Sequence, residues 1–437
     1  MMANATEAVA SWLNQHESEL VAFRRDLHSH PELGRQEHRT TRAIAARLSA
    51  AGLAPHPLPA GTGLWCDIGP IGRDTTATTA TTAMTATTAM TATTSPGVAS
   101  TGTASDRPDV PMVMVRADID ALPVLDVKDV PYGSTVPGVC HACGHDVHTA
   151  VVLGVGLALA AFARANPLAG TVRLVFQPAE ETMPGGALDV IDAGVLKSVS
   201  TVMAVHCDPS LDVGTIGLRA GPITSAADSV RVTLSGPGGH TSRPQNTVDL
   251  IYALSRLAVE LPAALSRLVD PRSSLSLVWG HVEAGTVANA IPRAGSIAGT
   301  VRTLSRDTWE DVPALVRRLA EQIVAPYGAD LALEYRRGVP PVVNSIETIE
   351  LFRTAVHRVL APGAEMSVTQ SLGGEDFAWY LDHVPGALAR LGTRIPEGPT
   401  YDLHQGSFDV DEAAIGIGVR FLAASALQAL ERAAASF

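Results

Sequence analysis

Short apolar runs rich in β-branched residues alternate with longer stretches of helical periodicity in the first half of the chain. The runs at 112–115, 172–176 and 201–205 have the length and composition of strands buried in a parallel sheet. Apolar residues recur at helical spacing over 8–27 and 39–51. This alternation predicts an α/β domain whose mostly parallel central sheet is flanked by helices.

The pattern changes between 229 and 338, where it indicates an independent unit. Strands are expected at 229–235, 274–282, 296–304 and 331–335, with helices at 248–261 and 308–327. The resulting order, β-α-β-β-α-β, is the split or ferredoxin-like arrangement. Helices and short strands resume after it. We therefore expect a larger domain made of 1–225 and 339–437, interrupted by an inserted domain at 226–338.

The chain has 437 residues, which exceeds the roughly 250–300 residues that one hydrophobic core usually organises. A tract of threonine and alanine at 75–104 contains almost no charge or large apolar side chain. Such a tract buries too little surface to offset chain entropy, so we predict a disordered hairpin-loop insertion. The alternative is a strand, because threonine favours extended structure.

Charge and hydropathy restrict the class of partner. The net charge is -12 and the chain has no run of lysine or arginine, which argues against nucleic acid or an anionic membrane surface. The segment 1–19 is polar and acidic, and no apolar stretch is expected to reach the 18 or so residues of a membrane span. These features predict a cytoplasmic protein that acts on a small molecule.

The four cysteines, Cys66, Cys140, Cys143 and Cys207, are too few for a disulfide framework in so long a chain. Cys140 and Cys143 have the spacing of a thioredoxin-like redox motif or of half a zinc ribbon. Neither interpretation is favoured. The redox motif lacks its strand-then-helix context, and no second cysteine pair is present to complete a zinc ribbon.

Metal-ligand side chains occur beside carboxylates in four separated fragments, at 141–146, 177–181, 206–208 and 403–405. Two of these follow predicted strands, and the carboxyl ends of parallel strands meet at one edge of a sheet. The first fragment precedes an apolar helical stretch at 150–161, whose first turn Asp146 is predicted to cap. We therefore expect the fragments to converge.

The converging side chains can hold two cations. The candidate ligands are one thiol, three imidazoles and one carboxylate: Cys143, His145, Glu181, His206 and His404. Five ligands are too many for one four-coordinate zinc that keeps an open position. Two divalent ions would retain about two positive charges beyond the ligands, enough to polarise a carbonyl and acidify water. Glu180 is then free to move the proton of that water to a leaving amine.

Each candidate also has a plain structural interpretation. A lone histidine such as His206 is usually structural, a cysteine in apolar surroundings such as Cys143 is usually a core residue, and the Glu180-Glu181 pair resembles a helix start. His240 follows glycines that permit close approach of a ligand, but it also fits an exposed turn.

The chain resembles the M20 metallopeptidase family, in particular its aminoacylase-like branch of N-acyl-amino-acid amidohydrolases, hippurate hydrolases and indoleacetyl-amino-acid hydrolases. His206 and His404 belong to the resemblance, together with the segments 24–28, 116–123, 141–148, 177–181, 185–187, 238–240, 289–292 and 373–377. The resemblance implies a catalytic α/β domain with a dinuclear site and a lid or dimerisation domain that corresponds to the insert. It also implies hydrolysis of the amide between an acyl group and an amino acid.

Carried over by motif position, the five candidate ligands would hold two divalent ions, zinc, manganese or cobalt, with Glu180 as the base. The resemblance assigns His240 to oxyanion stabilisation, from the neighbouring subunit in some relatives, and Asn289 and Arg302 to substrate binding. By pattern alone, Asn289 and Arg302 are surface residues. The resemblance assigns no individual role to Asp118, Asp120 or Glu375. It also implies a homodimer that forms through the inserted domain.

Three departures from the family pattern and three alternative functions remain. Ala290 stands where relatives often have valine, the segment 404–408 replaces a sequence that usually contains proline, and 75–104 has no counterpart in the family pattern. Besides a cytoplasmic N-acyl-amino-acid amidohydrolase, the same site suits a dipeptidase. A catalytically silent protein that binds amino-acid conjugates is the second alternative, and a thiol oxidoreductase centred on Cys140 and Cys143 is the third.

Overall fold

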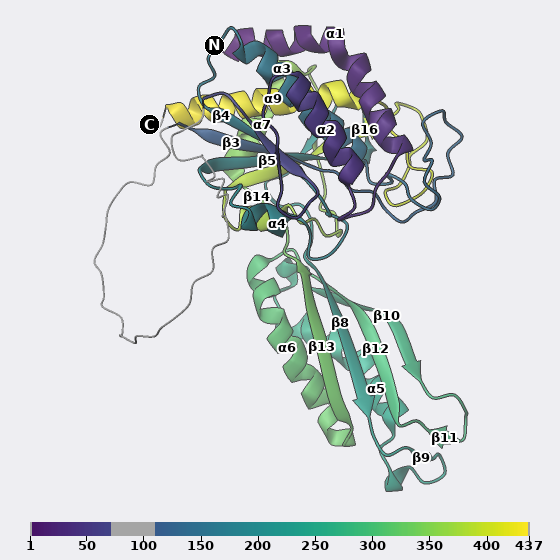
Figure 1. The fold of residues 1–437 in the computed structure, drawn as a ribbon. Coiled ribbons are helices and arrows are strands. Elements are labelled where there is room, and N and C mark those ends of the chain that lie inside the picture. The colour runs from purple at the N-terminus through teal and green to yellow at the C-terminus, as the bar shows by residue number, and fades with distance from the viewer. Residues whose placement is uncertain (1, 71–109, 436–437) are drawn as a thin grey trace, which may run out of the picture.

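The computed structural model describes residues 2–70 and 110–435. Figure 1 shows a larger α/β unit and a smaller unit that projects from it as a sheet covered by two helices. The predicted Thr/Ala insertion at 75–104 lies outside the described residues.

The larger unit is built on an eight-stranded sheet in which β3, β4, β5 and β16 run parallel. Strands β1 and β2 extend one edge in antiparallel fashion, and β6 and β15 form the other. Across the sheet the strands are β1 (His56–Pro57), β2 (Leu64–Ile68), β4 (Thr171–Gln177), β3 (Met112–Asp118), β5 (Val199–Asp212), β16 (Gly386–Arg394), β6 (Ile216–Leu218) and β15 (Glu365–Ser367). The predicted fold class is confirmed.

Both faces of this sheet are covered, as continuous apolar strands require. Along β3, Val113 and Val115 contribute to the larger core, whereas Met112 and Met114 contribute to a second core on the opposite face. The larger core is formed with helices α1 (Met2–Ser29), α2 (His38–Ala50), α3 (His145–Ala163), α7 (Ile346–Val359) and α9 (Ala413–Ala434). The second is closed by the short helices α4 (Ala187–Asp192) and α8 (Ala378–Leu381).

Two core helices are long and apolar enough to cross a membrane by length and composition, α3 and α9. The expectation that no apolar stretch reaches this length is therefore wrong. Both helices are mostly buried inside the protein, and they pack against each other and against α1. Burial in the core accounts for their apolar composition.

The smaller unit follows the order strand, helix, strand, strand, helix, strand. Its elements are β8 (Ala227–Ser235), α5 (Leu250–Leu268), β10 (Ser276–Ala284), β12 (Ala294–Arg302), α6 (Arg306–Val324) and β13 (Asp330–Val339). The strands form an antiparallel sheet in the order β10-β12-β8-β13. Apolar side chains of the two helices and of the sheet form a separate core. This separate core explains why the sequence pattern indicates an independent unit.

Short elements complete both units. At the far end of the insert, β9 (Gly239–His240) pairs with β11 (Ala290–Ile291), and β7 (Gly221–Pro222) pairs with β14 (Val343–Asn344) in the larger unit. The 3-10 helices are η1 (Pro244–Asn246), η2 (Pro271–Ser273) and η3 (Ala325–Tyr327).

One predicted helix cap is wrong. Helix α3 begins at His145 with Gly144 before it, and no side chain caps the helix. Asp146 is fully buried and instead accepts a hydrogen bond from His28, while Arg24 Nε lies 2.6 Å from its carboxylate. A buried carboxylate gains more from a guanidinium and an imidazole N–H as partners than from capping the helix.

Candidate metal centre

The candidate ligands come from four elements whose ends meet at one edge of the central sheet. Glu180 and Glu181 follow β4, His206 lies on β5, and Cys143 and His145 flank the start of α3. His404 arrives on the loop after β16, where its backbone N–H donates to the carbonyl of Ala142. This hydrogen bond, 2.8 Å long, joins the last ligand to the first.

Gly144 explains how two neighbouring ligands turn into one site. Its φ is +85°, in the left-handed region, and a Cβ built there would lie 2.7 Å from Cys207 Sγ. Both the backbone conformation and the lack of space therefore call for glycine. The turn places Cys143 two residues before α3, which begins at His145.

Two groups of ligand atoms share the Cys143 thiol. Sγ lies within 4.8 Å of ligand atoms of His145 and His206 in one group, and of Glu181 and His404 in the other. Cys143 Sγ and His206 Nε2 are 3.5 Å apart, and His404 Nε2 and Glu181 Oε1 are 3.2 Å apart. The five predicted ligands thus converge, and the two groups of ligand atoms would suit two cations.

Hydrogen bonds orient the ligand imidazoles. The Nδ1 of His206 donates to the carbonyl of Cys207 at 2.8 Å, so its Nε2 keeps a free lone pair facing Cys143. The Nδ1 of His145 contacts Asp120 Oδ1 at 3.2 Å, while its buried Nε2 has no hydrogen-bond partner. A ligand histidine held through its second nitrogen in this way is typical of metal sites.

His404 differs from the other ligands in being half exposed, with 53% of its side chain accessible. Hydrogen bonding to Cys143 and then to Glu181 raises the pKa of His404 to about 10. Burial raises the pKa of the Cys143 thiol above its usual value. In the metal-free protein both groups therefore hold protons that a cation must displace.

Glu180 lies beside the ligands and is only 6% exposed. One of its oxygens is 4.0 Å from Nε2 of His145. Burial, followed by the carboxylates of Glu375 and Glu181, raises the pKa of Glu180 well above its usual value. A carboxyl group with a raised pKa is suited to accept and return protons near neutral pH.

A buried ionic network centred on Arg116 supports the candidate metal centre. Arg116 lies 2.7 Å from Asp118, 2.7 Å from Asp376 and 3.1 Å from Glu375, and all four side chains are buried. Gln177 completes the network by accepting from Arg116 and donating to Asp376. Burial raises the pKa of Asp376 to about 7, although Arg116 opposes this shift.

The side chains fit divalent cations on their own chemistry. His145 Nε2 is a buried polar atom without a hydrogen-bond partner, and such an atom is costly unless something satisfies it. A thiolate, imidazoles and a carboxylate are ligands that zinc and neighbouring transition metals accept. Cys143, His145, Glu181, His206 and His404 would hold the cations.

Comparison with known proteins is consistent with this chemistry. The model of peptidase family M20/M25/M40 matches residues 114–428. The chain belongs to this family. As an M20 protein it is a metal-dependent hydrolase of amide bonds.

Three similar proteins illustrate the range of M20 relatives. The N-acetyl-L-cysteine deacetylase of Bacillus subtilis is 35% identical, over 96% of this chain and 90% of that protein. The solved YXEP protein of Bacillus subtilis, described as a dinuclear metal-binding M20 peptidase, is 32% identical with a TM-score of 0.76, over 96% and 99% of the two chains. A Rhodococcus jostii protein provisionally named glutamate-cysteine ligase 2-3 is 45% identical over 93% of this chain, which spans only 46% of that protein.

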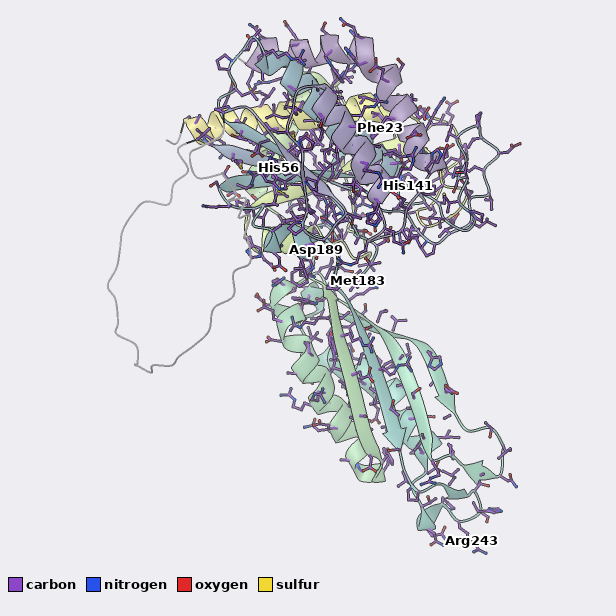
Figure 2. The ribbon with its side chains drawn as sticks, viewed as in Figure 1. Phe23, His56, His141, Met183, Asp189 and Arg243 are labelled. Carbon is purple, nitrogen blue, oxygen red and sulfur yellow. The ribbon has the colours of Figure 1, made fainter. Side chains whose placement is uncertain are left out.

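Three predicted site residues of this M20 chain do not join the cluster within one chain. His240 pairs with Ala290 at the far end of the insert, and Asn289 is next to this pair. Arg243, three residues after His240, lies at the tip of the insert in Figure 2, far from His141. Arg302 lies at the other end of the insert and donates to the carbonyl of Leu372.

His148 also positions the M20 site, although the sequence pattern assigns it no role of its own. His148 Nδ1 lies 2.6 Å from Asp118, and its Nε2 accepts the backbone N–H of Cys207 at 2.8 Å. It therefore fixes β5 beside His206. A signal existed, because His148 and His145 are three residues apart and share a face of α3.

Proposed function

We propose that this chain is an amidohydrolase that releases amino acids from N-acyl amino acids, with zinc, manganese or cobalt as its two cations. The observation that carries the proposal is a buried carboxylate, Glu180, beside a complete set of five ligands. A binding protein does not need this carboxylate. Cytoplasmic localisation stays a prediction from the sequence.

The reaction requires a proton to travel from water to the leaving nitrogen. Two cations held by the five ligands would polarise the amide carbonyl and make water more acidic. Glu180 accepts a proton from the attacking water and delivers it to the amide nitrogen, which leaves as the amine. Burial, followed by the carboxylates of Glu375 and Glu181, raises the pKa of Glu180, which favours its holding the proton between the two steps.

The hydrogen bond at one ring nitrogen of His240 suits the other nitrogen to oxyanion stabilisation. The backbone N–H of Ser242 donates to Nδ1 of His240 at 3.0 Å, so the proton of the neutral ring resides on Nε2. That N–H is a donor of the kind that stabilises an oxyanion. Because His240 lies at the far end of the insert, we propose that it serves the metal centre of a second copy.

The insert offers a surface for this homodimer. Strand β10 is an edge strand, and its Val278 and Val282 are more than 60% exposed. The neighbouring helix α5 exposes Ile251 and Val259. An unpaired edge beside apolar side chains favours pairing with another sheet edge.

Subunit mixing tests the shared site. In a mixture of Glu180→Gln and His240→Ala chains, each mixed dimer contains one site with both residues intact. If half the dimers are mixed, about a quarter of wild-type activity returns although each variant alone is nearly inactive. If His240 acts within its own chain, mixing restores nothing.

The choice of test substrates for a hydrolysis assay follows from the relatives and from the alternative functions. An N-acetyl-L-cysteine deacetylase is among the relatives, so N-acetylcysteine heads a panel that also contains benzoyl and indoleacetyl amino acids. Matching dipeptides test the dipeptidase alternative. Preference for a dipeptide over the N-acetyl amino acid with the same carboxyl-terminal residue would replace the proposal.

The central test is Glu180→Gln in metal-replete protein. We expect metal content to stay at the wild-type level and kcat to fall by roughly 10²–10⁴-fold, because the proton acceptor is lost. The matched control is Glu334→Gln, an exposed carboxylate on β13 whose side chain is 62% accessible. Near-normal turnover by Glu180→Gln, or binding without hydrolysis by the wild type, would contradict the proposal.

A further inference from the structure

A cavity of about 500 Å³ opens beside the metal centre. Its wall includes Cys207 and Asp208, which follow His206, and Leu403, which precedes His404. The volume is in the range of small-molecule sites, roughly 300–1,000 Å³. A substrate whose amide lies at the metals can therefore extend into it.

Arg390 is the one arginine that the described part of the chain places on the wall of this cavity. It lies on β16 next to His206 in the sheet register, and it is 7% exposed. Its neighbours on the strand, Leu388, Ala389 and Leu391, are fully buried apolar residues. A charged side chain within a buried apolar strand requires a specific reason.

No hydrogen bond or ion pair is formed by Arg390 with residues 2–70 or 110–435. Other buried arginines behave differently. Arg24 lies 2.6 Å from Asp146, Arg116 lies 2.7 Å from Asp118, and Arg173 lies 2.7 Å from Asp67. Among the described residues, the guanidinium of Arg390 thus has no protein partner at the cavity.

The nearby carboxylates do not satisfy it. Asp208 and Glu375 attract Arg390 electrostatically without forming an ion pair, and Asp208 accepts hydrogen bonds from the backbone and hydroxyl of Ser210. Burial lowers the pKa of Arg390, but a guanidinium remains charged at neutral pH. A buried, unpaired charge is unfavourable until an anion binds it.

We propose that Arg390 binds a carboxylate of the substrate in this cavity through two parallel N–H···O bonds. The inference rests on the proposed function, because it assigns the substrate that the metal centre cleaves. Planar guanidinium and carboxylate groups match each other in this geometry. Arg302, the candidate from sequence, is more exposed and already donates to the carbonyl of Leu372.

Two carboxylates of an N-acyl amino acid can occupy the site: the α-carboxylate, or a second carboxylate on the side chain. Calorimetry with metal-loaded Glu180→Gln protein separates them without turnover. The probes are N-acetyl-L-alanine, its α-amide, N-acetyl-L-aspartate and the α-amide of N-acetyl-L-aspartate. Each is titrated into the parent and into the same protein carrying Arg390→Met.

The matched control is Arg394→Met, four residues along β16, where the arginine is one-third exposed and pairs with Asp212 at 2.7 Å. It should leave all four affinities unchanged. Arg390→Lys serves as a second variant that keeps the charge but removes the planar fork. Urea unfolding of every variant reports whether the fold is intact.

Loss of the Arg390 guanidinium should weaken a bound carboxylate by roughly 10–100-fold. A loss for N-acetylalanine but not for its amide identifies the α-carboxylate. A loss confined to the two aspartate derivatives identifies the second carboxylate. Either result supports the proposal, and Arg390→Lys should give an intermediate loss.

Equal weakening of all four probes, the uncharged amide included, would overturn the proposal, because it indicates a structural role. Unchanged affinities, or no binding of any probe by the parent protein, would overturn it as well. Failure of the proposed function has a different signature. In that case wild-type protein binds the probes, with the Arg390 dependence intact, but hydrolyses none of them.

Discussion

Gly144→Ala tests whether the turn between the first two ligands is as constrained as the structure indicates. An alanine at φ +85° costs roughly 1–2 kcal/mol, because the left-handed region crowds its Cβ. That Cβ would also meet Cys207 at 2.7 Å from Sγ and 2.9 Å from its Cβ, and overpacking of this kind typically costs about 1–3 kcal/mol. The total is therefore about 2–5 kcal/mol of unfolding free energy.

A control on the same segment separates the two contributions. Gly138 has φ +74°, but a Cβ there meets nothing within 4 Å. Gly138→Ala should cost only the conformational part, about 1–2 kcal/mol. Urea unfolding of the metal-free variants measures both costs, and mass spectrometry of metal-loaded protein measures bound cations, which Gly144→Ala should reduce.

Equal destabilisation by the two alanines would refute the packing argument. Full metal occupancy in Gly144→Ala would also show that the position of Cys143 and His145 does not depend on this glycine.

Three further predictions concern the metal centre and its support. Metal loading at pH 8 should release about two protons, from Cys143 and His404, whose pKa values are raised in the metal-free protein. The affinity for the metal should then rise with pH up to the pKa of His404. Calorimetric titration in buffers of different ionisation enthalpy measures the protons released, and no release would contradict this prediction. Arg116→Met leaves buried carboxylates unpaired and should lower the unfolding free energy by about 3–5 kcal/mol. A loss below about 1 kcal/mol in urea unfolding would show that this ion pairing contributes little to stability. Cys140→Ser should retain metal-dependent turnover, since Cys140 is a free, buried thiol; activity that survives metal removal but not this substitution would revive the oxidoreductase alternative.

Strand positions were predictable because the apolar runs are buried on both faces, but their ends were not. The run predicted at 201–205 continues as β5 to Asp212, because β16 pairs with it that far. Helix α5 continues past Pro262 to Leu268. Burial of Leu265 against the insert core favours this extension despite the cost of proline.

Convergence of the five ligands was predictable from strand ends, whereas their supporting contacts were not. Asp146 is paired with Arg24 and His28, more than 110 residues earlier in the chain. Such pairs leave no local pattern. Arg390 shows the same limit: its charge is visible within an apolar run, but only the fold shows that it has no carboxylate partner among the described residues.

His240 illustrates a limit of another kind. Its motif indicates a role in catalysis, yet one chain places it at the far end of the insert. The proposal that His240 serves the metal centre of a second copy depends on the position of the insert, which the sequence pattern does not give.

Anomalous X-ray scattering from crystals of zinc-loaded protein can locate the cations held by the five ligands. We expect two zinc peaks per chain, with the Cys143 sulfur between them and His206 and His404 on opposite sides. A single peak, or two peaks that do not share Cys143, would contradict it.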